Sequence, residues 1–277
     1  MKKPKSVIVL HLFLIIFAFL SLYPFFVMTM GAFKTQSELM QNAAGFPIHW
    51  VLNNFVRLLN YNSHIILRTY LNALGISTVS TVVTLLLSSL AGYAFAKFRF
   101  RGKQMLFVFL LATMMVPMEV NMTPLFIMFS KVNWLNSYQV QILPGIANVL
   151  AMYMYKQYME GLPDSVIESA QLDGASRWRV FKDIVMPMVK PCTSALAIIM
   201  FMGKWNEYLL PRTMITKQEY MPIMVILPTL SDTGANLVIP WELICAGCVI
   251  VTLPLLIVFF IFQDKFMSSV VMGAVKE

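Results

Sequence analysis

The chain has 277 residues, of which 58% are hydrophobic and only 12% are charged, and its mean hydropathy is +0.72. A soluble domain does not need that much apolar surface, so the composition excludes this class and indicates a polytopic membrane protein. The net charge of +8 could suggest nucleic-acid binding. The cations flank apolar runs instead of forming one patch, so we expect no nucleic-acid partner.

Six apolar runs follow one another along the chain, and each is long enough to cross a bilayer, which takes about 20 residues as a helix. They cover roughly residues 7–30, 70–96, 105–130, 137–159, 192–212 and 242–263. Irregular backbone cannot face lipid, so we expect an all-α fold with six transmembrane helices. The first run is too long for a signal peptide and lacks a small-residue cleavage site, so we expect it to be retained.

The distribution of charge predicts how the chain is oriented. With six spans both termini lie on one side, and the segments of that side hold more than twice as many Lys and Arg residues as the other. The positive-inside rule therefore predicts cytoplasmic termini and a cytoplasmic loop at about 160–191. Loops at about 31–69 and 213–241 are then external. None of the three could form a sizeable core of its own, so we expect a single transmembrane domain over 1–277.

The third run contains two polar residues at membrane depth. Glu119 and Asn121 lie two positions apart, beside Pro117 and Pro124. A kinked polar stretch there indicates either a cavity lining or a helix contact.

The loop at 160–191 predicts two short helices broken at a glycine. Residues 162–165 (Leu-Pro-Asp-Ser) form a helix-start signal, and Ser165 and Glu168 have the spacing of a capping box. Gly174 can take the left-handed conformation that ends a helix, and Ser176 can cap the next one.

From periodicity alone, this loop could be a solvated amphipathic hairpin on the membrane surface. Trp178, Phe181 and Val185 recur at intervals of three and four and give its second helix an apolar stripe. The small residues gathered at the turn instead indicate close approach by a partner. They are Ser169, Ala170, Gly174 and Ala175.

Lys204 and Glu207 lie three apart in the fifth run, with Trp205, Asn206 and Tyr208. Charges at membrane depth are costly and usually face a pore or an opposite charge. One interpretation is a local ion pair near the outer interface, with Trp and Tyr as anchors. The other is that Trp205, Asn206 and Glu207 line a solute pathway.

The sequence has no phosphate-binding loop motif and no Ser/His/Asp or metal-ligand constellation. We therefore expect no catalytic residue, no metal site and no cofactor bound by this chain. Cys245 and Cys248 share a helix face, but no His or carboxylate completes a metal set beside them, so they and Cys192 are expected to be packing residues.

The cytoplasmic loop resembles the EAA loop of permease subunits in binding-protein-dependent ABC importers. The family pattern is Glu-Ala-Ala, three residues, Gly, nine residues, Ile, one residue, Leu-Pro. The chain matches it from Glu168 to Pro187 and departs only at Ser169 and Met186. The resemblance implies that an ATPase grips this loop, through the residues Glu168, Ser169, Ala170, Asp173, Gly174 and Ala175.

The likeness extends over most of the chain and is closest to carbohydrate-uptake permeases, in particular the smaller six-span partner of the maltose and multiple-sugar type. The motifs that carry it include Tyr23-Pro24-Phe25, Asn72-Ala73-Leu74, Leu135-Asn136 and Trp205-Asn206-Glu207-Tyr208. It implies the type I importer permease fold in the cell membrane and an oligosaccharide substrate, for which a raffinose-type sugar is one guess.

The same resemblance implies the partners. They are a second permease that forms a heterodimer with this chain, two ATPase subunits that bind ATP and Mg, and an external sugar-binding protein. In similar permeases the loop at 213–241 reaches toward the binding protein, so Ser231, Asp232, Thr233 and Gly234 are candidate contacts.

Two other classes are weighed against this interpretation. An integral membrane enzyme would need polar catalytic groups that converge at one depth, and the sequence offers none. A self-contained secondary transporter would work without ATPase partners and usually shows repeated halves, which are not evident.

Overall fold

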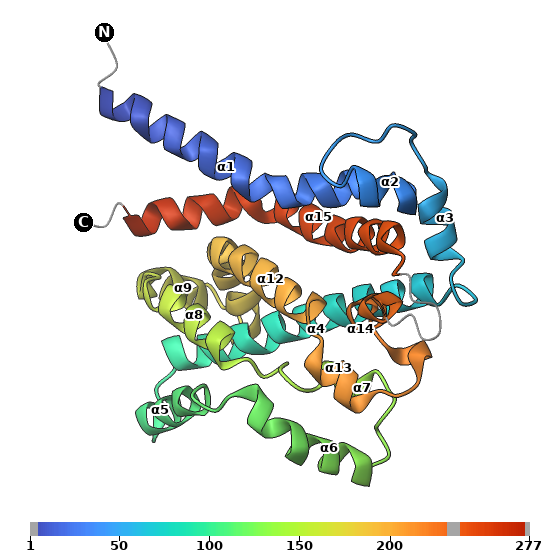
Figure 1. Cartoon of the computed structure of the whole chain (residues 1–277). Helices are drawn as coiled ribbons and strands as arrows, with labels where there is room; N and C mark the ends of the chain where they lie inside the picture. Colours follow the sequence, from blue (N-terminus) through green and yellow to red (C-terminus); the bar gives the residue numbers. More distant parts are fainter. Residues whose placement is uncertain (1–4, 232–238, 275–277) are drawn as a thin grey trace. The chain divides into compact units, whose positions relative to one another are not determined.

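The computed structural model describes residues 5–231 and 239–274, and within these ranges the regular secondary structure is entirely helical (Figure 1). This confirms the predicted all-α class. The chain divides into two units, and each is described by itself. The first comprises Met1–Tyr70 with Val225–Leu253, and the second comprises Leu71–Met224 with Pro254–Glu277.

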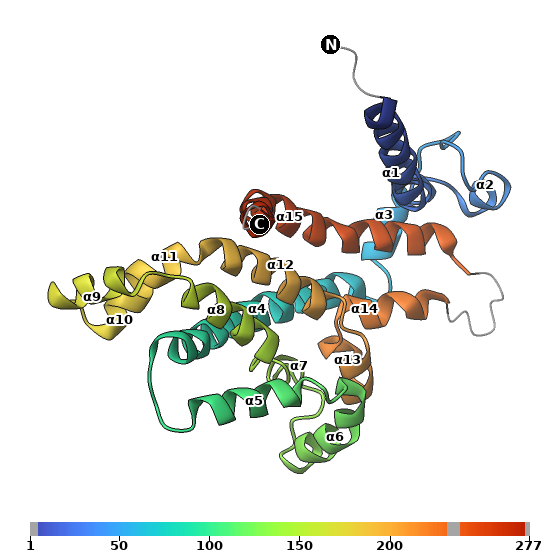
Figure 2. The same ribbon diagram turned by 90° about the vertical axis from the view of Figure 1, so that its left-hand side faces the viewer.

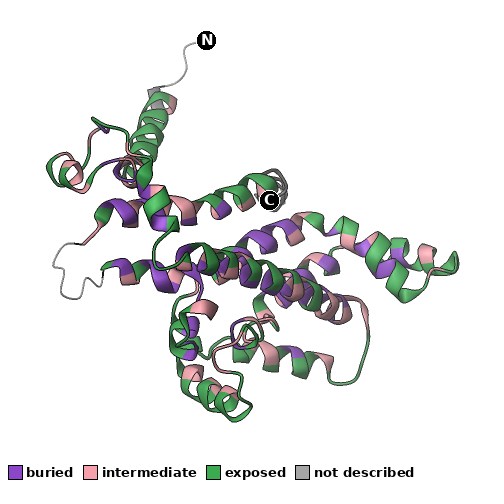
Figure 3. Ribbon diagram, turned by 90° about the vertical axis from the view of Figure 1, so that its right-hand side faces the viewer, coloured by how far each residue is buried: buried purple, intermediate pink, exposed green. Residues whose placement is uncertain are grey.

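The first unit contains α1 (Lys5–Gly31), α2 (Gln36–Gln41), α3 (Asn53–Leu59) and η4 (Leu227–Ser231), together with the first residues of α4 (Ile65–Lys97) and of α15 (Trp241–Ala274). The apolar side chains of α1 are largely exposed within the chain (Figure 3). A helix that is apolar all round and uncovered by its own chain is expected to be covered by lipid or by a partner helix.

A buried lysine organises the segment after α1. Lys34 is fully buried, and its Nζ donates to the carbonyl oxygens of Asn42 at 2.5 Å and Gly45 at 2.7 Å. The side chain of Asn54 donates to the carbonyl of Lys34 at 2.8 Å. Buried polar groups are stable only when they are paired in this way, so this part of the predicted external loop has a fixed structure.

The second unit holds the rest of α4 and α15 and a series of shorter helices. These are α5 (Lys103–Thr113), η1 (Met118–Asn121), α6 (Met122–Lys131), α7 (Gln139–Ile142), α8 (Val149–Glu160), α9 (Asp164–Leu172), α10 (Arg177–Arg179), the π-helical η2 (Val180–Val185), α11 (Met186–Met188), α12 (Lys190–Trp205), α13 (Leu209–Met214) and η3 (Gln218–Tyr220). The short α14 (Ile223–Ile226) lies across the boundary between the two units.

The described residues contain three continuous helices that are long and apolar enough to cross a membrane, at Val7–Gly31, Ile65–Lys97 and Trp241–Gln263. Two bent pairs raise the number to five: Lys103–Thr113 with Met118–Lys131, bent by 89°, and Arg177–Met188 with Lys190–Met214, bent by 79°. The number of six spans therefore stays a prediction, because three of the six predicted runs are broken within the described residues.

Proline and glycine explain the breaks in the third and fourth runs. Pro117 has a non-helical ψ of 141° and stands between α5 and η1. In the fourth run, helix is lost from Leu143 to Asn148, where Pro144 precedes Gly145, whose φ is +92°. Proline lacks the N–H that helix requires, and glycine alone adopts positive φ cheaply, so apolar composition could not keep these runs straight.

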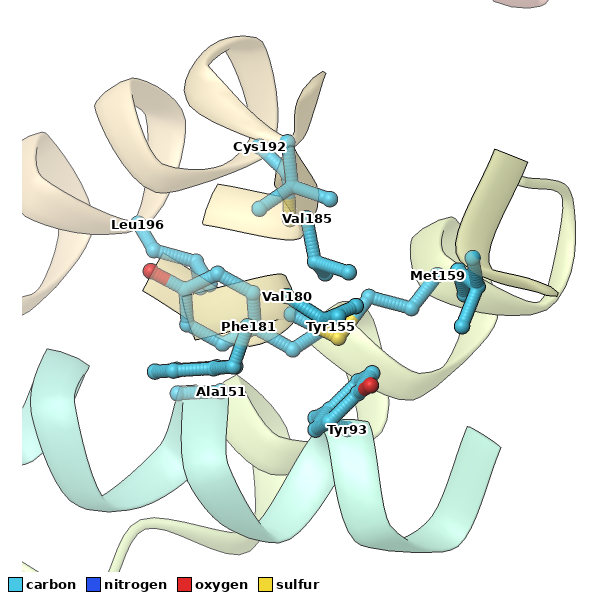
Figure 4. Close-up of a cluster of buried hydrophobic side chains, with 11 residues drawn as sticks. Tyr93, Ala151, Tyr155, Met159, Val180, Phe181, Val185, Cys192 and Leu196 are labelled. Carbon is cyan, nitrogen blue, oxygen red and sulfur yellow. The ribbon is translucent and has the colours of Figure 1, made fainter. Parts of the chain in front are cut away.

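The core of the second unit joins three membrane segments to the predicted cytoplasmic loop. Side chains from α4, α8, α9, η2 and α12 form one buried cluster (Figure 4): Tyr93, Ala151, Tyr155, Met159, Ile167, Val180, Phe181, Val185, Val189, Cys192 and Leu196. Within it, α4 and α8 cross closely at Gly92, where an added Cβ would come within 2.6 Å of Tyr155 Cβ. The loop therefore shares a single core with the helices that carry it.

Candidate functional site

The first half of the predicted cytoplasmic loop is α9, which ends in a tight glycine cap. Gly174 has φ +81°, its N–H donates to the carbonyl of Gln171 at 3.0 Å, and the N–H of Ala175 donates to Ala170 at 3.0 Å. These two bonds are the Schellman arrangement that ends many helices. The prediction that Gly174 ends the helix in a left-handed conformation is confirmed.

The helix α9 begins within the predicted start signal at 162–165, but without the predicted capping box. The helix begins at Asp164 with Pro163 as its N-cap, and no side chain caps it. Ser165 lies inside the helix, and its carbonyl accepts the Ser169 hydroxyl at 2.8 Å. The predicted capping box of Ser165 and Glu168 is therefore not formed. The N-cap is instead Pro163, two residues upstream of Ser165, and proline is favoured at a helix entry.

The second half of the loop runs through α10, η2 and α11 into the fifth predicted span. Ser176 caps α10 as predicted, because its Oγ accepts the N–H of Arg179 at 3.3 Å. Phe181 and Val185 are buried in the shared core, but Trp178 is 57% exposed. The predicted apolar stripe thus holds only in part: two of its members pack inward and the third stays on the surface.

Lys97, the last residue of α4, ties α9 to the membrane helices. Its Nζ donates to the carbonyl of Leu162 at 2.7 Å and to the carboxylate of Asp164 at 2.6 Å. This hydrogen bond and the charge of Lys97 lower the pKa of Asp164 below its ordinary value. The carboxylate also lies in the first turn of α9, where a negative charge is favoured by the helix dipole.

The turn between α9 and α10 is mostly exposed, and the helices on either side of it pack into the shared core. Figure 2 shows α9 and α10 at one end of this unit, beyond α8 and α12. Of the predicted coupling residues, Glu168, Ser169, Asp173 and Gly174 are exposed, whereas Ala170 and Ala175 are half-buried. The structure thus places all six around one turn, with four of them exposed.

The turn also presents an apolar residue that the sequence analysis did not single out. Leu172 is 89% exposed, close to the exposed Trp178 in the chain. A cavity of about 460 Å³ lies at the base of α9 and is lined by charged groups of both signs, among them Arg99, Lys103 and Glu168. The signal for Leu172 was available, since it is an apolar residue in the last turn of the predicted helix, two positions before Gly174.

In the fifth predicted span, the ion pair is formed as one of the two interpretations expected. Lys204 Nζ lies 2.7 Å from Glu207 Oε2, and their side chains are 11% and 27% exposed. Both residues line a cavity of about 280 Å³ together with α4 and the irregular stretch 144–148.

The neighbouring residues of this motif are placed differently. Trp205 is 1% exposed and stacks on Phe201 with ring centroids 5.8 Å apart, and it does not line the cavity. Asn206 caps the end of α12, and its side-chain amide donates to the Met202 carbonyl at 2.9 Å. For Trp205 this placement favours a packing role over contact with solute.

The other predicted residues fall in less enclosed places. Glu119 is exposed and Asn121 half-buried, both in η1 at the 89° bend. Ser231 is exposed, and its Oγ donates to the Pro228 carbonyl at 2.6 Å. Asp232, Thr233 and Gly234 lie outside the described residues. Among the residues that are described, no group of three His, Cys, Asp or Glu side chains is placed to hold a metal.

Three amide side chains clamp the chain segment that follows α13. Asn136 Oδ1 accepts the N–H groups of Thr216 and Lys217 at 2.6 and 2.9 Å. Asn72 donates to the carbonyls of Glu219 and Met221, and the buried Gln141 donates to that of Tyr220. These contacts give a physical reason for the Asn72 and Leu135-Asn136 motifs, which the sequence alone presented only as a likeness.

Residues 84–271 match the family described as binding-protein-dependent transport system inner membrane component. The chain is 33% identical over 273 residues to the arabinooligosaccharides transport system permease protein AraQ of Bacillus subtilis (strain 168), over 97% of this chain and 95% of that protein. It is 31% identical over 270 residues to the maltodextrin transport system permease protein MalD of Streptococcus pneumoniae, with 96% and 94% covered.

Among solved structures, the fold is similar to a chain in the crystal structure of a bacterial ABC transporter involved in the import of the acidic polysaccharide alginate. The TM-score is 0.84 with 20% sequence identity, over 96% of this chain and 99% of that chain. The chain belongs to the family of binding-protein-dependent transport system inner membrane components, and it is a multi-pass transport subunit of the cell membrane.

Proposed function

We propose that this chain is one permease subunit of an ATP-driven sugar importer, and that the turn at 168–175 is the part that the ATPase subunits grip. The observation that carries the proposal is the connection of an exposed turn to membrane helices through one buried core. A force applied at the turn would move α8 and α12 together, since Ile167, Phe181 and Val189 pack between them.

In this proposal the chain crosses the membrane six times with both termini in the cytoplasm, the broken runs counting as bent spans. It pairs with a second permease, and two ATPase subunits bind ATP and magnesium. ATP binding brings the ATPase subunits together, and the motion passes through α9 to switch the pair from inward-open to outward-open. Such a switch is a shift between two populations, driven by tighter binding to one of them.

The substrate that we propose is a neutral oligosaccharide. The names of two similar proteins support this choice, because one is an arabinooligosaccharides permease and the other a maltodextrin permease. A raffinose-type sugar is one candidate within this class. An external binding protein would deliver the sugar near the loop at 213–241, with Ser231 at the edge of the contact.

Glu207 is the residue of the fifth span best placed to line the pathway, because it borders the cavity beside Lys204. Asn206 next to it and the polar bend at Glu119 and Asn121 are further candidates for the wall. Trp205 supports this region from within the fold by stacking on Phe201.

The experiment that tests the proposal is reconstitution of the chain in proteoliposomes with candidate permease, ATPase and binding-protein partners from the same cell. Uptake of labelled raffinose and maltotriose and sugar-stimulated ATPase activity are measured. We expect uptake that requires ATP and every partner. Uptake by this chain alone would instead establish a secondary transporter, and the absence of co-purifying ATPase subunits would contradict the assembly.

A cysteine at Ser231, in a background without the three native cysteines, tests the orientation. We expect a membrane-impermeant thiol reagent to label it from outside, and docking of the binding protein to slow the labelling. Labelling from the cytoplasmic side alone would contradict the proposed topology.

A further inference from the structure

One face of α4 carries a row of buried hydroxyl groups. Ser77, Ser80, Thr81, Thr84 and Ser88 share one face of the helix, and each is at most 7% exposed. Thr81 is the middle residue of this 33-residue helix, so it lies near the centre of the membrane if the helix spans it evenly. Polar groups at that depth are expected to face protein or an aqueous cavity.

Three of these residues, Ser80, Thr81 and Thr84, line the cavity of about 280 Å³ that Lys204 and Glu207 also border. The opposite wall is the irregular stretch of residues 144–148 between α7 and α8. Non-helical backbone is tolerated at membrane depth where it lines a cavity, and here it leaves room beside α4.

Two of the hydroxyls have no partner. Ser80 Oγ and Thr81 Oγ1 are buried, and neither makes a hydrogen bond within the described part of the chain. By contrast, Ser88 on the same face donates to the Asn148 carbonyl at 3.2 Å, and Ser89 donates to that of Leu86 at 2.9 Å. Leaving a buried hydroxyl unpaired is costly, and rotation of these two side chains would turn their hydroxyls toward a ligand in the adjoining cavity.

The other residues that line the cavity indicate the chemical class of the ligand. The charges of Lys204 and Glu207 compensate each other at 2.7 Å, so the cavity offers little attraction to an ion. Ile146, Ile199 and Met200 add apolar surface beside the hydroxyls and the ion pair. A sugar ring has both apolar C–H faces and hydroxyl groups at its rim, and this mixed wall complements both.

The volume of the cavity limits the size of the ligand that it can hold. A water molecule occupies about 30 Å³ in the liquid, whereas pockets for small organic ligands begin near 300 Å³. The cavity of about 280 Å³ is therefore far larger than one water requires and suits a single ring, not a whole oligosaccharide.

We propose that this cavity is a sugar subsite within the transport pathway, which receives one neutral ring at a time. Ser80 and Thr81 bind hydroxyls of the ring, and the Lys204–Glu207 pair binds others. The inference rests on the proposed sugar transport, but it assigns a contact to α4 that the transport function does not require.

The test uses the reconstituted complex with raffinose and maltotriose as probes. The double variant Ser80→Ala with Thr81→Val removes both orphan hydroxyls at nearly constant shape. We expect the KM for uptake of the transported probe to rise about tenfold, because two hydrogen bonds are lost. The melting temperature of the complex should stay equal or rise, since no internal bond is broken. Ser89→Ala, which alters a buried hydroxyl off the cavity, is the control and should leave KM unchanged.

A second variant fills the space. Gly203 borders the cavity, and a Cβ added there meets nothing within 4 Å. We expect Gly203→Leu to assemble normally, to keep its basal ATPase activity and to lose sugar uptake.

The outcomes separate the two proposals. Normal KM in the double variant and normal uptake by Gly203→Leu, with an active wild-type complex, would show that the cavity holds only water and would overturn the subsite. A wild-type complex that imports neither probe would contradict the proposed sugar transport instead. A fall in melting temperature without a change in KM would assign the hydroxyls a packing role and likewise overturn the inference.

Discussion

The turn at 168–175 and the cavity beside Lys204 differ in how they are built. The turn is made from consecutive residues, and its cap bonds join Gln171 to Gly174 and Ala170 to Ala175. The cavity is made from three distant segments, at Ser80 in α4, Gly145 between α7 and α8, and Lys204 in α12. The turn can therefore be predicted from local rules of helix capping, whereas the cavity forms only when the helices pack together.

The largest effect is expected at the turn. Gly174→Pro imposes a φ near −65° where the native value is +81° and removes the N–H that bonds to Gln171. We expect sugar-stimulated ATPase activity of the assembled complex to fall at least tenfold, while the chain remains in the membrane. Gly161→Ala is the matched control, because Gly161 has a negative φ of −75°. Normal stimulation in Gly174→Pro would remove the coupling role from this turn.

Trp205→Ala is expected to act on stability rather than on uptake. The side chain is almost fully buried against Phe201, and truncating a buried aromatic costs about 3–5 kcal/mol in soluble cores. Yield and melting temperature of the complex should fall, with normal uptake per assembled complex. The neighbouring variant Asn206→Leu is measured in the same way for comparison. Normal yield together with lost uptake in Trp205→Ala would instead indicate that Trp205 lines the pathway.

Gly92→Ala tests the core that joins the turn to the membrane helices. Its new Cβ would lie 2.6 Å from Tyr155 Cβ and 3.0 Å from the backbone nitrogen of Lys156, so α4 and α8 must separate. Overpacking of this kind costs about 1–3 kcal/mol. We expect a lower melting temperature and weaker coupling together. Gly75→Ala on the same helix meets nothing within 4 Å and should be neutral. Equal melting temperatures for the two variants would show that the crossing is not tightly packed.

The smallest effect concerns the Lys97–Asp164 contact. Lys97 lowers the pKa of the Asp164 carboxyl, so the contact stabilises the fold above the ordinary carboxyl value of about 4 and is lost as the pH falls below it. Asp164→Asn should slightly lower the melting temperature at pH 7, and this difference should shrink as the pH falls below about 4. A difference that stays constant as the pH falls would show that packing, and not charge, is what the substitution disturbs.

Sequence reasoning reached the fold class and the turn because both depend on short-range rules. Apolar run length predicted the helical class, and Gly174 and Ser176 predicted where the helices of the loop end and begin. The kink beside Pro117 was predicted, but neither its 89° bend nor the break at Gly145 was, since composition measures how apolar a run is and not whether its backbone continues.

The candidate site of the fifth span could be predicted only in part. The spacing of Lys204 and Glu207 indicated their ion pair, but nothing local indicated that Trp205 turns inward onto Phe201. The hydroxyl row of α4 was present at helical spacing from Ser77 to Ser88, and it would have been found by testing apolar runs for a polar face.

The amide clamp after α13 has a consequence for how such a surface can diversify. Asn72 and Gln141 hold the carbonyl oxygens of Glu219, Tyr220 and Met221, which every amino acid possesses. Side chains that this segment exposes, such as Lys217, can therefore be exchanged over evolutionary time without loosening the backbone beneath them, whereas the buried Met221 cannot. In the proposed topology, a lineage that acquires a new binding protein could change these exposed side chains one by one while keeping the backbone geometry.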